Sequence, residues 1–543
     1  MRPALALTLL LAATPLSAQR RPSVDVLDYD LTLTLPDAGA TIDGVAVLTV
    51  RRVIRGGSAD TLALDLLDLT VKSVAVDGRD TRFSHTDGVI RVPFGTTRDT
   101  ARVTVTYTGA VKDGLIVGTD SAGRWVAFGD NWPNRARHWI PSVDHPSDKA
   151  TVTWTVIAPD DRKVVANGTL VEEKKVEQPD DPDGHAGAPI AMKRTRWRES
   201  RPIAPYLMVI GVGPLVEYPL GNTACGFAED RGCVRQMVYT MPEQRRILPG
   251  FFAEADSVVT FFSRSFGPFP YEKLAHLQSL TRFGGMENAS AIFYTDGAFR
   301  RNGVGYGLMA HETAHQWFGD AVTEREWPHL WLSEGFATYL AALYTQKSRG
   351  DSAFRAEMSR TRATVVGAAV VAQRPVIDTI ETTLTSLLNA NSYQKGGWVL
   401  HMLREEIGDD AFFRGARIYV ERHRHATALS DDLRAAMEVA SGKDLKPFFA
   451  QWLTRPGYPE FDARWTYDAG KLSLTVRQSE RFGLFTFPLT VEFTDAGGTA
   501  HRARLVVPAR VENTFVLNAG LRAAPLHTRV DPDVALLAKI TER

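Results

Sequence analysis

The chain has 543 residues, in which lysine plus arginine equals aspartate plus glutamate at 63 each. Balanced charge leaves no basic footprint, so we expect no nucleic-acid partner, and the apolar content of 44% is ordinary for a globular protein. A chain of this length exceeds what one hydrophobic core supports, and it predicts about three domains.

The first 18 residues have the pattern of a secretory signal peptide. Arg2 provides a basic start, an apolar run extends from Ala4 to Leu16, and small residues precede a cut before Gln19. The run is short for a membrane span, and no other segment is long and apolar enough for one. We therefore expect an exported protein, periplasmic or extracellular, with no stable membrane insertion after the signal is removed.

Residues 19–216 are expected to form an N-terminal antiparallel β domain. Short runs of β-forming residues alternate with turns throughout this region. Examples are Leu31–Leu35, Ala46–Val50, Val103–Tyr107 and Thr151–Val156.

The chain contains two cysteines, Cys225 and Cys233. A pair this close in an oxidising compartment is a candidate disulfide that closes a small hairpin. Two free thiols are the alternative, and thiol titration of the unreduced protein distinguishes the two.

Residues 217–455 are expected to form a mainly helical domain. Helices are predicted at Glu243–Phe262, Tyr306–Phe318, Trp327–Tyr344, Trp398–Ile407 and Asp410–Arg422. Pro456 and Gly457 mark the end of this domain, and alternating strands return between Phe461 and Val516. Residues 456–543 are thus expected to form a small C-terminal β domain, and the whole chain is of the multidomain α+β class.

The second of these helices carries the sequence H-E-x-x-H, with His311, Glu312 and His315. Residues four apart lie about 40° apart around a helix and roughly 6 Å along it, so both imidazoles can reach one metal ion. The neighbouring residues are apolar, and buried imidazoles without partners cost free energy that a metal relieves. Two surface histidines on an amphipathic helix are the alternative.

Glu334 lies in the next apolar helical run and completes a set of two histidines and one carboxylate. A catalytic zinc site has three protein ligands and one position left for water. Glu312, beside the first ligand, can reach such a water as a general base.

With these residues the sequence resembles the M1 (gluzincin) aminopeptidases, in particular the group of leukotriene A4 hydrolase and aminopeptidase N. Three motifs occur in the family's order. H-E-x-x-H is followed by eighteen residues and Glu334, within HETAHQWFGD and LWLSEGFA; upstream, Gly284-Gly285-Met286-Glu287-Asn288 matches G-x-M-E-N; downstream, Tyr393-Gln394-Lys395-Gly396 is similar to Y-x-K-G, with Gln394 where an acidic residue is common.

The resemblance implies a thermolysin-like catalytic domain and a C-terminal β-sandwich. It implies one Zn²⁺ ion held by His311, His315 and Glu334, with Glu312 as general base and the Tyr393 hydroxyl stabilising the oxyanion. The G-x-M-E-N residues are implied to bind the substrate, with the Glu287 carboxylate pairing with a free α-ammonium so that the first peptide bond lies at the metal. Gly284 and Gly285 would let an extended substrate approach the backbone.

The function predicted is therefore that of a zinc metallo-aminopeptidase, a hydrolase acting on peptides with a free N-terminus. Two alternatives remain. A zinc endopeptidase shares the metal motif, and N-blocked peptides distinguish it from an aminopeptidase. A non-catalytic binding protein of this fold is expected to have lost a ligand, the base or the tyrosine, and this sequence retains all of them.

The sequence departs from the family pattern at Trp132, where a Gln or Glu that helps to hold the amino terminus is expected. Asp130 or Asn131 could substitute, or Glu287 could act with less help. Trp132 itself is either a packing residue or a wall of the substrate pocket. Ser333, adjacent to the third ligand, could hydrogen-bond a ligand histidine.

Overall fold

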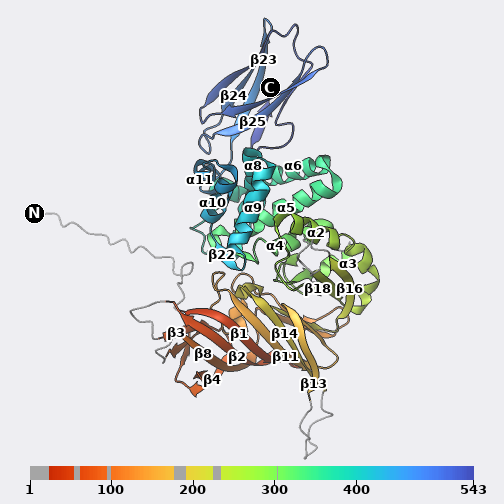
Figure 1. Cartoon of the computed structure of the whole chain (residues 1–543), viewed down its shortest axis with the longest axis vertical. Helices are drawn as coiled ribbons and strands as arrows, with labels where there is room; N and C mark the ends of the chain where they lie inside the picture. The colour runs from red at the N-terminus through yellow and green to blue at the C-terminus, as the bar shows by residue number, and fades with distance from the viewer. Residues whose placement is uncertain (1–23, 54–60, 95–98, 177–190, 224–233, 302–303) are drawn as a thin grey trace, which may run out of the picture.

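The computed structural model describes residues 24–53, 61–94, 99–176, 191–223, 234–301 and 304–543. A β domain, a mainly helical domain and a second β domain follow one another along the long axis of the molecule (Figure 1). This arrangement confirms the expected multidomain α+β class. The expected signal peptide and both cysteines lie outside the described residues, and the exact domain boundaries stay predictions.

An eight-stranded sheet dominates the N-terminal domain, in the order β13-β14-β11-β1-β2-β8-β4-β5. Buried and exposed residues alternate along β1 and β2, as the sequence pattern predicted. The pairing of β1 with β11 is parallel, with Leu31 opposite Trp154, and is an exception in a sheet whose other described pairings are antiparallel, as expected. A parallel neighbour requires a long connection, and more than a hundred residues separate these two strands. The strands are β1 (Val24–Thr34), β2 (Thr41–Arg52), β4 (Thr70–Val76), β5 (Arg79–Asp80), β8 (Thr100–Ala110), β11 (Ala150–Pro159), β13 (Thr169–Val176) and β14 (Met192–Ile203).

Two smaller sheets complete this domain. One has the order β3-β7-β6 and the other the order β12-β15-β10-β9. The segment after β10 packs into the core, where the Trp139 ring stacks on Trp154 at 5.4 Å and the Tyr107 hydroxyl donates to the Trp139 carbonyl at 2.9 Å. The elements are β3 (Thr61–Asp65), β6 (Ser84–Thr86), β7 (Val89–Pro93), β9 (Leu115–Thr119), β10 (Trp125–Gly129), η1 (Ala136–His138), β12 (Lys163–Ala166), η2 (Pro205–Leu207) and β15 (Ile210–Gly213).

The central domain joins a five-stranded sheet to a group of helices. The sheet has the order β16-β17-β18-β20-β19. Its strands are β16 (Val216–Thr223), β17 (Val234–Thr240), β18 (Lys273–Ser279), β19 (Gly285–Met286) and β20 (Ala291–Thr295). The helices that follow are α3 (Asp296–Arg301), α4 (Tyr306–His315), α5 (Trp331–Arg349), α6 (Asp351–Gly367), α7 (Ala369–Gln373), α8 (Gly396–Ile407), α9 (Asp409–His423), α10 (Ser430–Ser441) and α11 (Lys446–Leu453). Shorter elements connect them: η4 (Trp327–His329), η5 (Leu384–Leu387), the π-helical turn η6 (Asn391–Lys395), and the paired strands β21 (Val322–Glu324) and β22 (Ala426–Ala428).

The helix expected over Glu243–Phe262 is not continuous. The chain forms η3 (Pro242–Ile247), α1 (Leu248–Phe251) and α2 (Ala255–Phe266) instead. Pro249 lies in the first turn of α1, where a proline is tolerated, whereas inside a longer helix it would remove a hydrogen bond. Helix α4 also ends at His315, earlier than the expected run.

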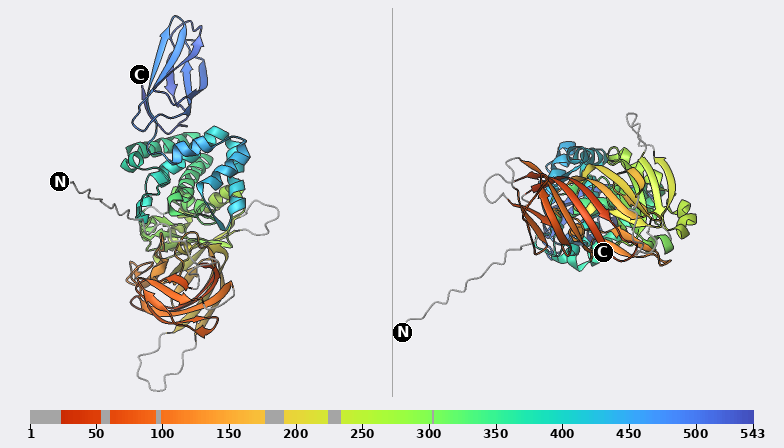
Figure 2. Two further views of the ribbon diagram at one scale, coloured as in Figure 1. Left: turned by 90° about the vertical axis from the view of Figure 1, so that its left-hand side faces the viewer. Right: turned by 90° about the horizontal axis from the view of Figure 1, so that it is seen from below.

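The C-terminal domain consists of a sheet in the order β27-β24-β23-β29 and a sheet in the order β26-β25-β28. The rings of Phe461 and Phe487 stack at 5.3 Å between the two sheets, as in a sandwich. This domain lies at the opposite end of the molecule from the N-terminal β domain (Figure 2). The strands are β23 (Glu460–Asp468), β24 (Lys471–Gln478), β25 (Phe487–Thr494), β26 (Ala500–Val507), β27 (Glu512–Ala519), β28 (His527–Val530) and β29 (Lys539–Glu542).

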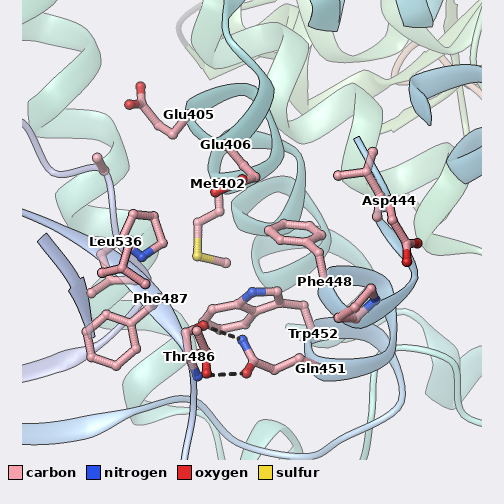
Figure 3. Close-up of a pocket in the computed structure, with 15 residues that line it drawn as sticks. Met402, Glu405, Glu406, Asp444, Phe448, Gln451, Trp452, Thr486, Phe487 and Leu536 are labelled. Carbon is pink, nitrogen blue, oxygen red and sulfur yellow. Dashed lines mark hydrogen bonds between the residues drawn. The ribbon is translucent and has the colours of Figure 1, made fainter. Parts of the chain in front are cut away.

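An apolar crevice lies where the C-terminal domain meets helices α8 and α11 (Figure 3). Its walls include Met402, Phe448, Trp452 and Phe487. The Gln451 amide joins the domains across it, because it donates to the Thr486 carbonyl and accepts from the Thr486 amide, both at 3.0 Å. Among the described helices, none combines the length and apolarity needed to cross a membrane.

Candidate active site

Helix α4 places His311, Glu312 and His315 next to helix α5. The Phe318 ring, just after α4, stacks on Phe336 of α5 with ring centroids 4.1 Å apart. Gly319 has a φ of 126°, and a Cβ at this position would lie 2.4 Å from Ser333 Oγ of α5. Only glycine therefore allows the chain to turn this close to α5.

Three donor atoms from these two helices converge. His311 Nε2 and His315 Nε2 are 3.2 Å apart, and Glu334 Oε2 lies 3.3 Å from the first and 3.4 Å from the second. Tetrahedral ligands at the usual zinc distances of about 2.0–2.2 Å are separated by about 3.3–3.6 Å, so this spacing fits one ion. Glu334 Oε2 is buried without a hydrogen-bond partner among the described residues, which leaves it available as a ligand.

The electrostatics of the site also favour a cation. Burial, together with the negative charges of Glu287 and Glu334, raises the pKa of Glu312 well above its usual value. Burial acts against charge on Glu334 as well, but the neighbouring imidazoles of His315 and His311 hold the pKa of Glu334 well below its usual range. Three carboxylates thus surround two imidazoles in a buried site, an excess of negative charge that a divalent ion balances.

The far nitrogen of His315 is also held. His315 Nδ1 is 2.9 Å from Ser333 Oγ and 3.2 Å from the Phe318 carbonyl oxygen. With Nε2 turned toward the other ligand atoms, the ring proton lies on Nδ1 and is shared between these two acceptors. Ser333 therefore makes the hydrogen bond to a candidate ligand histidine that was expected from the sequence.

Tyr393 reaches the same carboxylate from the turn η6. Its hydroxyl donates to Glu334 Oε1 at 2.8 Å, and its ring is parallel to that of His311 at 6.1 Å. This approach depends on two glycines, because a Cβ on Gly335 of α5 would lie 2.9 Å from the backbone of Gly396, the first residue of α8. Helix α8 and η6 can therefore lie directly against α5.

Glu287 faces the ligand set from the end of strand β19. It lines one pocket together with His311, Glu312, His315, Glu334 and Tyr393. Burial raises the pKa of Glu287, and the positive charge of His315 opposes this rise. The Glu287 carboxylate lies within 4.8 Å of donor atoms of Glu312 and His315.

The loop that carries Glu287 is tied to α4 by Gln316, a buried residue next to His315. The Gln316 amide donates to the Glu287 carbonyl and to Asp320 Oδ2, both at 2.7 Å, and accepts from the Ser290 amide at 2.8 Å. Both N–H groups of the Gln316 amide and its oxygen therefore have partners. This contact fixes the loop relative to the metal ligands.

The other residues of the G-x-M-E-N segment differ in their placement. Met286 and Gly285 line the pocket, whereas Gly284 and Asn288 do not. A Cβ on Gly285 would lie 2.3 Å from Glu312 Oε1, so this glycine makes room for the Glu312 side chain. The sequence had suggested that this glycine lets a substrate approach the backbone, whereas in the structure it makes room for Glu312.

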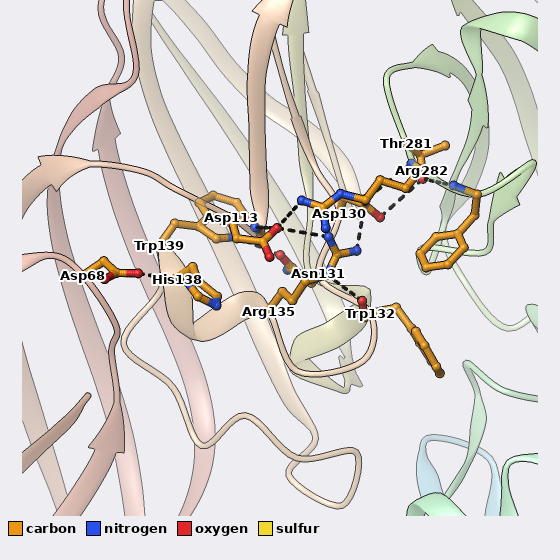
Figure 4. Close-up of polar contacts among 12 residues, drawn as sticks. Asp68, Asp113, Asp130, Asn131, Trp132, Arg135, His138, Trp139, Thr281 and Arg282 are labelled. Atoms are coloured by element: carbon orange, nitrogen blue, oxygen red, sulfur yellow. Dashed lines mark hydrogen bonds and ion pairs between the residues drawn. The ribbon is translucent and has the colours of Figure 1, made fainter. Parts of the chain in front are cut away.

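Trp132 both packs and lines the pocket. Its ring makes edge-to-face contacts with Phe283 at 6.0 Å and with Trp327 at 5.7 Å. Asp130 and Asn131, the two residues considered as replacements for the family's Gln or Glu, bind other groups (Figure 4). Asp130 pairs with Arg135 NH2 at 3.0 Å, and Asn131 donates to the Pro205 and Met208 carbonyls and accepts from Trp139 Nε1. Neither lines the pocket.

Two residues that shape the site, Gln316 and Gly335, do not stand out as functional in the sequence. Gln316 lies between His315 and the apolar pair Trp317-Phe318. A polar side chain inside such an apolar run needs hydrogen-bond partners, and this is the sequence feature that could have identified it. Gly335 directly follows Glu334, and a glycine in the middle of a buried helix indicates a close approach.

Family comparisons agree with this arrangement. Residues 252–452 match the peptidase family M1 domain, and residues 26–184 match the peptidase M1 N-terminal domain. Among curated proteins, probable aminopeptidase 2 of Sulfurisphaera tokodaii is 28% identical over 466 residues, which cover 79% of this chain and 55% of that protein. Human glutamyl aminopeptidase is 28% identical over 375 residues, covering 66% of this chain and 36% of that protein. The chain thus spans about half the length, or less, of these curated relatives.

Solved structures show the same fold. The M1 zinc metallopeptidase of Deinococcus radiodurans has a TM-score of 0.67 at 26% identity, and the match covers 82% of this chain and 96% of that one. Aminopeptidase A of Legionella pneumophila, solved with aspartic acid, has a TM-score of 0.80 at 19% identity, covering 96% of this chain and 60% of that one. The second likeness concerns the fold alone.

Proposed function

The chain belongs to the M1 peptidase family, and from this membership and the geometry of the site we propose that it is a zinc aminopeptidase that removes the first residue of peptides. The observation that carries this proposal is the position of Glu287, which shares one pocket with His311, His315 and Glu334. A carboxylate beside a metal centre pairs with a free α-ammonium and brings the first peptide bond to the metal.

His311, His315 and Glu334 would hold one Zn²⁺ ion, which supplies a Lewis acid that polarises a carbonyl and lowers the pKa of water. Glu312, whose pKa burial raises, would take the proton of the attacking water and deliver it to the leaving amine nitrogen. The Tyr393 hydroxyl, 2.8 Å from Glu334 Oε1, is near enough to the ligands to donate to the carbonyl oxygen as negative charge develops on it.

The test uses the zinc-loaded mature protein and one mixture of free and N-acetylated peptides, with products followed by mass spectrometry. Stepwise loss of single residues from the free peptides, with the acetylated peptides untouched, is the expected result. Internal cuts in acetylated peptides would make the protein an endopeptidase. No cleavage at all would favour a binding protein on a peptidase fold.

Two variants and a metal control make this test specific. Glu312→Gln is expected to keep zinc and lose turnover by about 10²–10⁴-fold, because it removes the proton acceptor. Glu287→Ala is expected to keep zinc and lose most aminopeptidase turnover, so wild-type turnover in that variant would refute its assignment. Chelation is expected to abolish turnover, and added Zn²⁺ to restore it.

Export is proposed on the sequence of residues 1–18 alone. Expression of the full chain in a bacterial host, followed by N-terminal sequencing of the periplasmic fraction, tests it. A chain beginning at Gln19 is expected, and an uncleaved chain retained in the cytoplasm would contradict export.

A further inference from the structure

We propose that Trp132 is a specificity-determining residue that limits the first residue of the substrate to a small, uncharged side chain. This inference depends on the aminopeptidase function proposed above, since it concerns the side chain on the first Cα of a peptide.

Two points of a bound peptide are set by groups already described. The ammonium pairs with Glu287, and the first carbonyl lies at the metal ligands on α4 and α5. The first Cα lies between these two points, so its side chain must extend to the remaining wall of the pocket. That wall consists of Trp132, Phe283, Met286 and Leu388.

Two aromatic rings and one backbone hydrogen bond hold Trp132 in place. Phe283 and Trp327 meet it edge-to-face, with interplanar angles of 89° and 78°. Arg135 Nε donates to the Trp132 carbonyl at 2.7 Å, and the residue is only 3% exposed. A large substrate side chain could displace the indole only by breaking these aromatic contacts.

The charged residues near Trp132 pair with one another and do not line the pocket. Arg135 pairs with Asp130 at 3.0 Å and with Asp113 at 3.1 Å, and Arg282 pairs with Asp113 at 2.6 Å (Figure 4). Among the described residues that line the pocket, the charged ones are Glu287, Glu312 and the three candidate ligands. An acidic side chain on the first residue would therefore be buried beside carboxylates and an apolar wall without a counter-charge. A basic side chain of the length of arginine is excluded by its size.

The space in front of this wall is small. The whole cavity, including the space between the candidate metal ligands, has a volume of about 40 Å³. Pockets that bury drug-sized ligands have about 300–1,000 Å³. A methyl group on the first Cα is compatible with this space, whereas an isobutyl or benzyl group requires Trp132 to move.

The experiment compares tetrapeptides that differ only in their first residue, which is Ala, Leu, Phe, Asp or Arg. For the wild-type protein, kcat/KM is expected to be highest for Ala by about tenfold or more, as one methylene in an apolar pocket is typically worth 10–200-fold. In Trp132→Ala the Leu/Ala and Phe/Ala ratios are expected to rise by about tenfold or more, and in Trp132→Phe by less. The Asp/Ala ratio is expected to stay low in both variants, because neither change adds a counter-charge.

The matched control is Trp465→Ala, in strand β23 of the C-terminal domain, which should leave every ratio unchanged. If Trp132→Ala does not fold, Trp132→Leu, which keeps more apolar bulk, takes its place. The Leu/Ala and Phe/Ala ratios are expected to rise in that variant as well. Release of Leu or Phe by the wild type as fast as Ala, or unchanged ratios in folded Trp132 variants, would overturn the inference while leaving the aminopeptidase function intact. If the wild type releases no first residue at all, the proposed function itself fails and this inference with it.

Discussion

At the scale of single residues, Gln316 connects the two chemical parts of the site. Its buried amide bonds the Glu287 carbonyl, the Ser290 amide and Asp320, and it follows directly after His315. One side chain therefore ties the loop that carries the candidate ammonium partner to the helix that carries two candidate metal ligands.

We expect Gln316→Met to weaken binding of the substrate ammonium while zinc content is retained. Methionine keeps the volume but leaves buried polar groups without partners, at a cost of about 1–3 kcal/mol, and so KM for free peptides should rise about tenfold. Alanine hydroxamate and propionic hydroxamate differ only in the α-amino group, so their inhibition constants isolate this effect. Inhibition by the alanine compound should weaken, and inhibition by the propionic compound should not.

Gln346→Met, in the part of α5 remote from the ligands, is the control for Gln316. It should change neither inhibition constant. Equal weakening of both hydroxamates in Gln316→Met would show a general disturbance of the site and would contradict the positioning role.

At the scale of elements, the site depends on how closely α5 and α8 pack. The contact of Gly335 with Gly396 lets η6 bring Tyr393 to Glu334. Because the atoms facing Gly335 belong to the backbone, an added methyl cannot be accommodated by a side-chain rotation.

Gly335→Ala is therefore expected to push α8 and η6 away from α5. We expect a loss of about 1–3 kcal/mol in the free energy of unfolding, typical of overpacking, and a fall in kcat of at least about tenfold as Tyr393 is displaced. Denaturant unfolding and steady-state kinetics measure the two effects. Gly307→Ala in α4 is the control, since a Cβ there meets no atom within 4 Å; equal behaviour of the two variants would contradict the role of the close contact.

At the scale of the whole molecule, the N-terminal domain contacts the turn that follows helix α4. Lys149, just before β11, donates through Nζ to the Asp320 carbonyl at 2.8 Å and to the Ala321 and Ala426 carbonyls at 3.0 Å. The Tyr206 hydroxyl donates to the Gly319 carbonyl at 3.2 Å. The turn that follows α4 is thus supported by another domain.

The charge of Lys149 makes this docking dependent on pH. Burial lowers the pKa of Lys149 to about 7 in the folded protein, whereas an exposed lysine in the unfolded chain titrates near its model value of 10.5. Between these values the unfolded chain binds the extra proton, so the free energy of unfolding contributed by Lys149 increases as the pH rises from about 7 to about 10.5. Below about pH 7 this contribution is at its minimum.

We therefore expect the free energy of unfolding of the wild type minus that of Lys149→Met to increase as the pH rises from 7 toward 10. Denaturant unfolding measures both values. Lys112→Met, which removes an exposed lysine of the same domain, serves as the control and should show no such growth. A difference that is constant or falls over this range would contradict the assignment.

The sequence by itself determined the chemistry of the candidate site, because a helix repeat places His311 and His315 on one face, with Glu312 beside them, whatever the fold around them. Local pattern also predicted the three-domain α+β layout, since alternating and helical runs are separated by clear breaks. Motif order along the chain was enough to name Glu334, Glu287 and Tyr393 as candidates.

Only the tertiary structure decided how these residues meet. The parallel pairing of β1 with β11, the close contact of Gly335 with Gly396 and the bonds of Gln316 all join segments that are distant in sequence or lie on different elements. The position of Trp132 in the pocket, and the contacts of Asp130 with Thr281 and Arg282, depend on the docking of two domains. Such contacts follow from long-range packing, in which many segments compete for the same neighbours, and local spacing in a sequence carries no information on that competition.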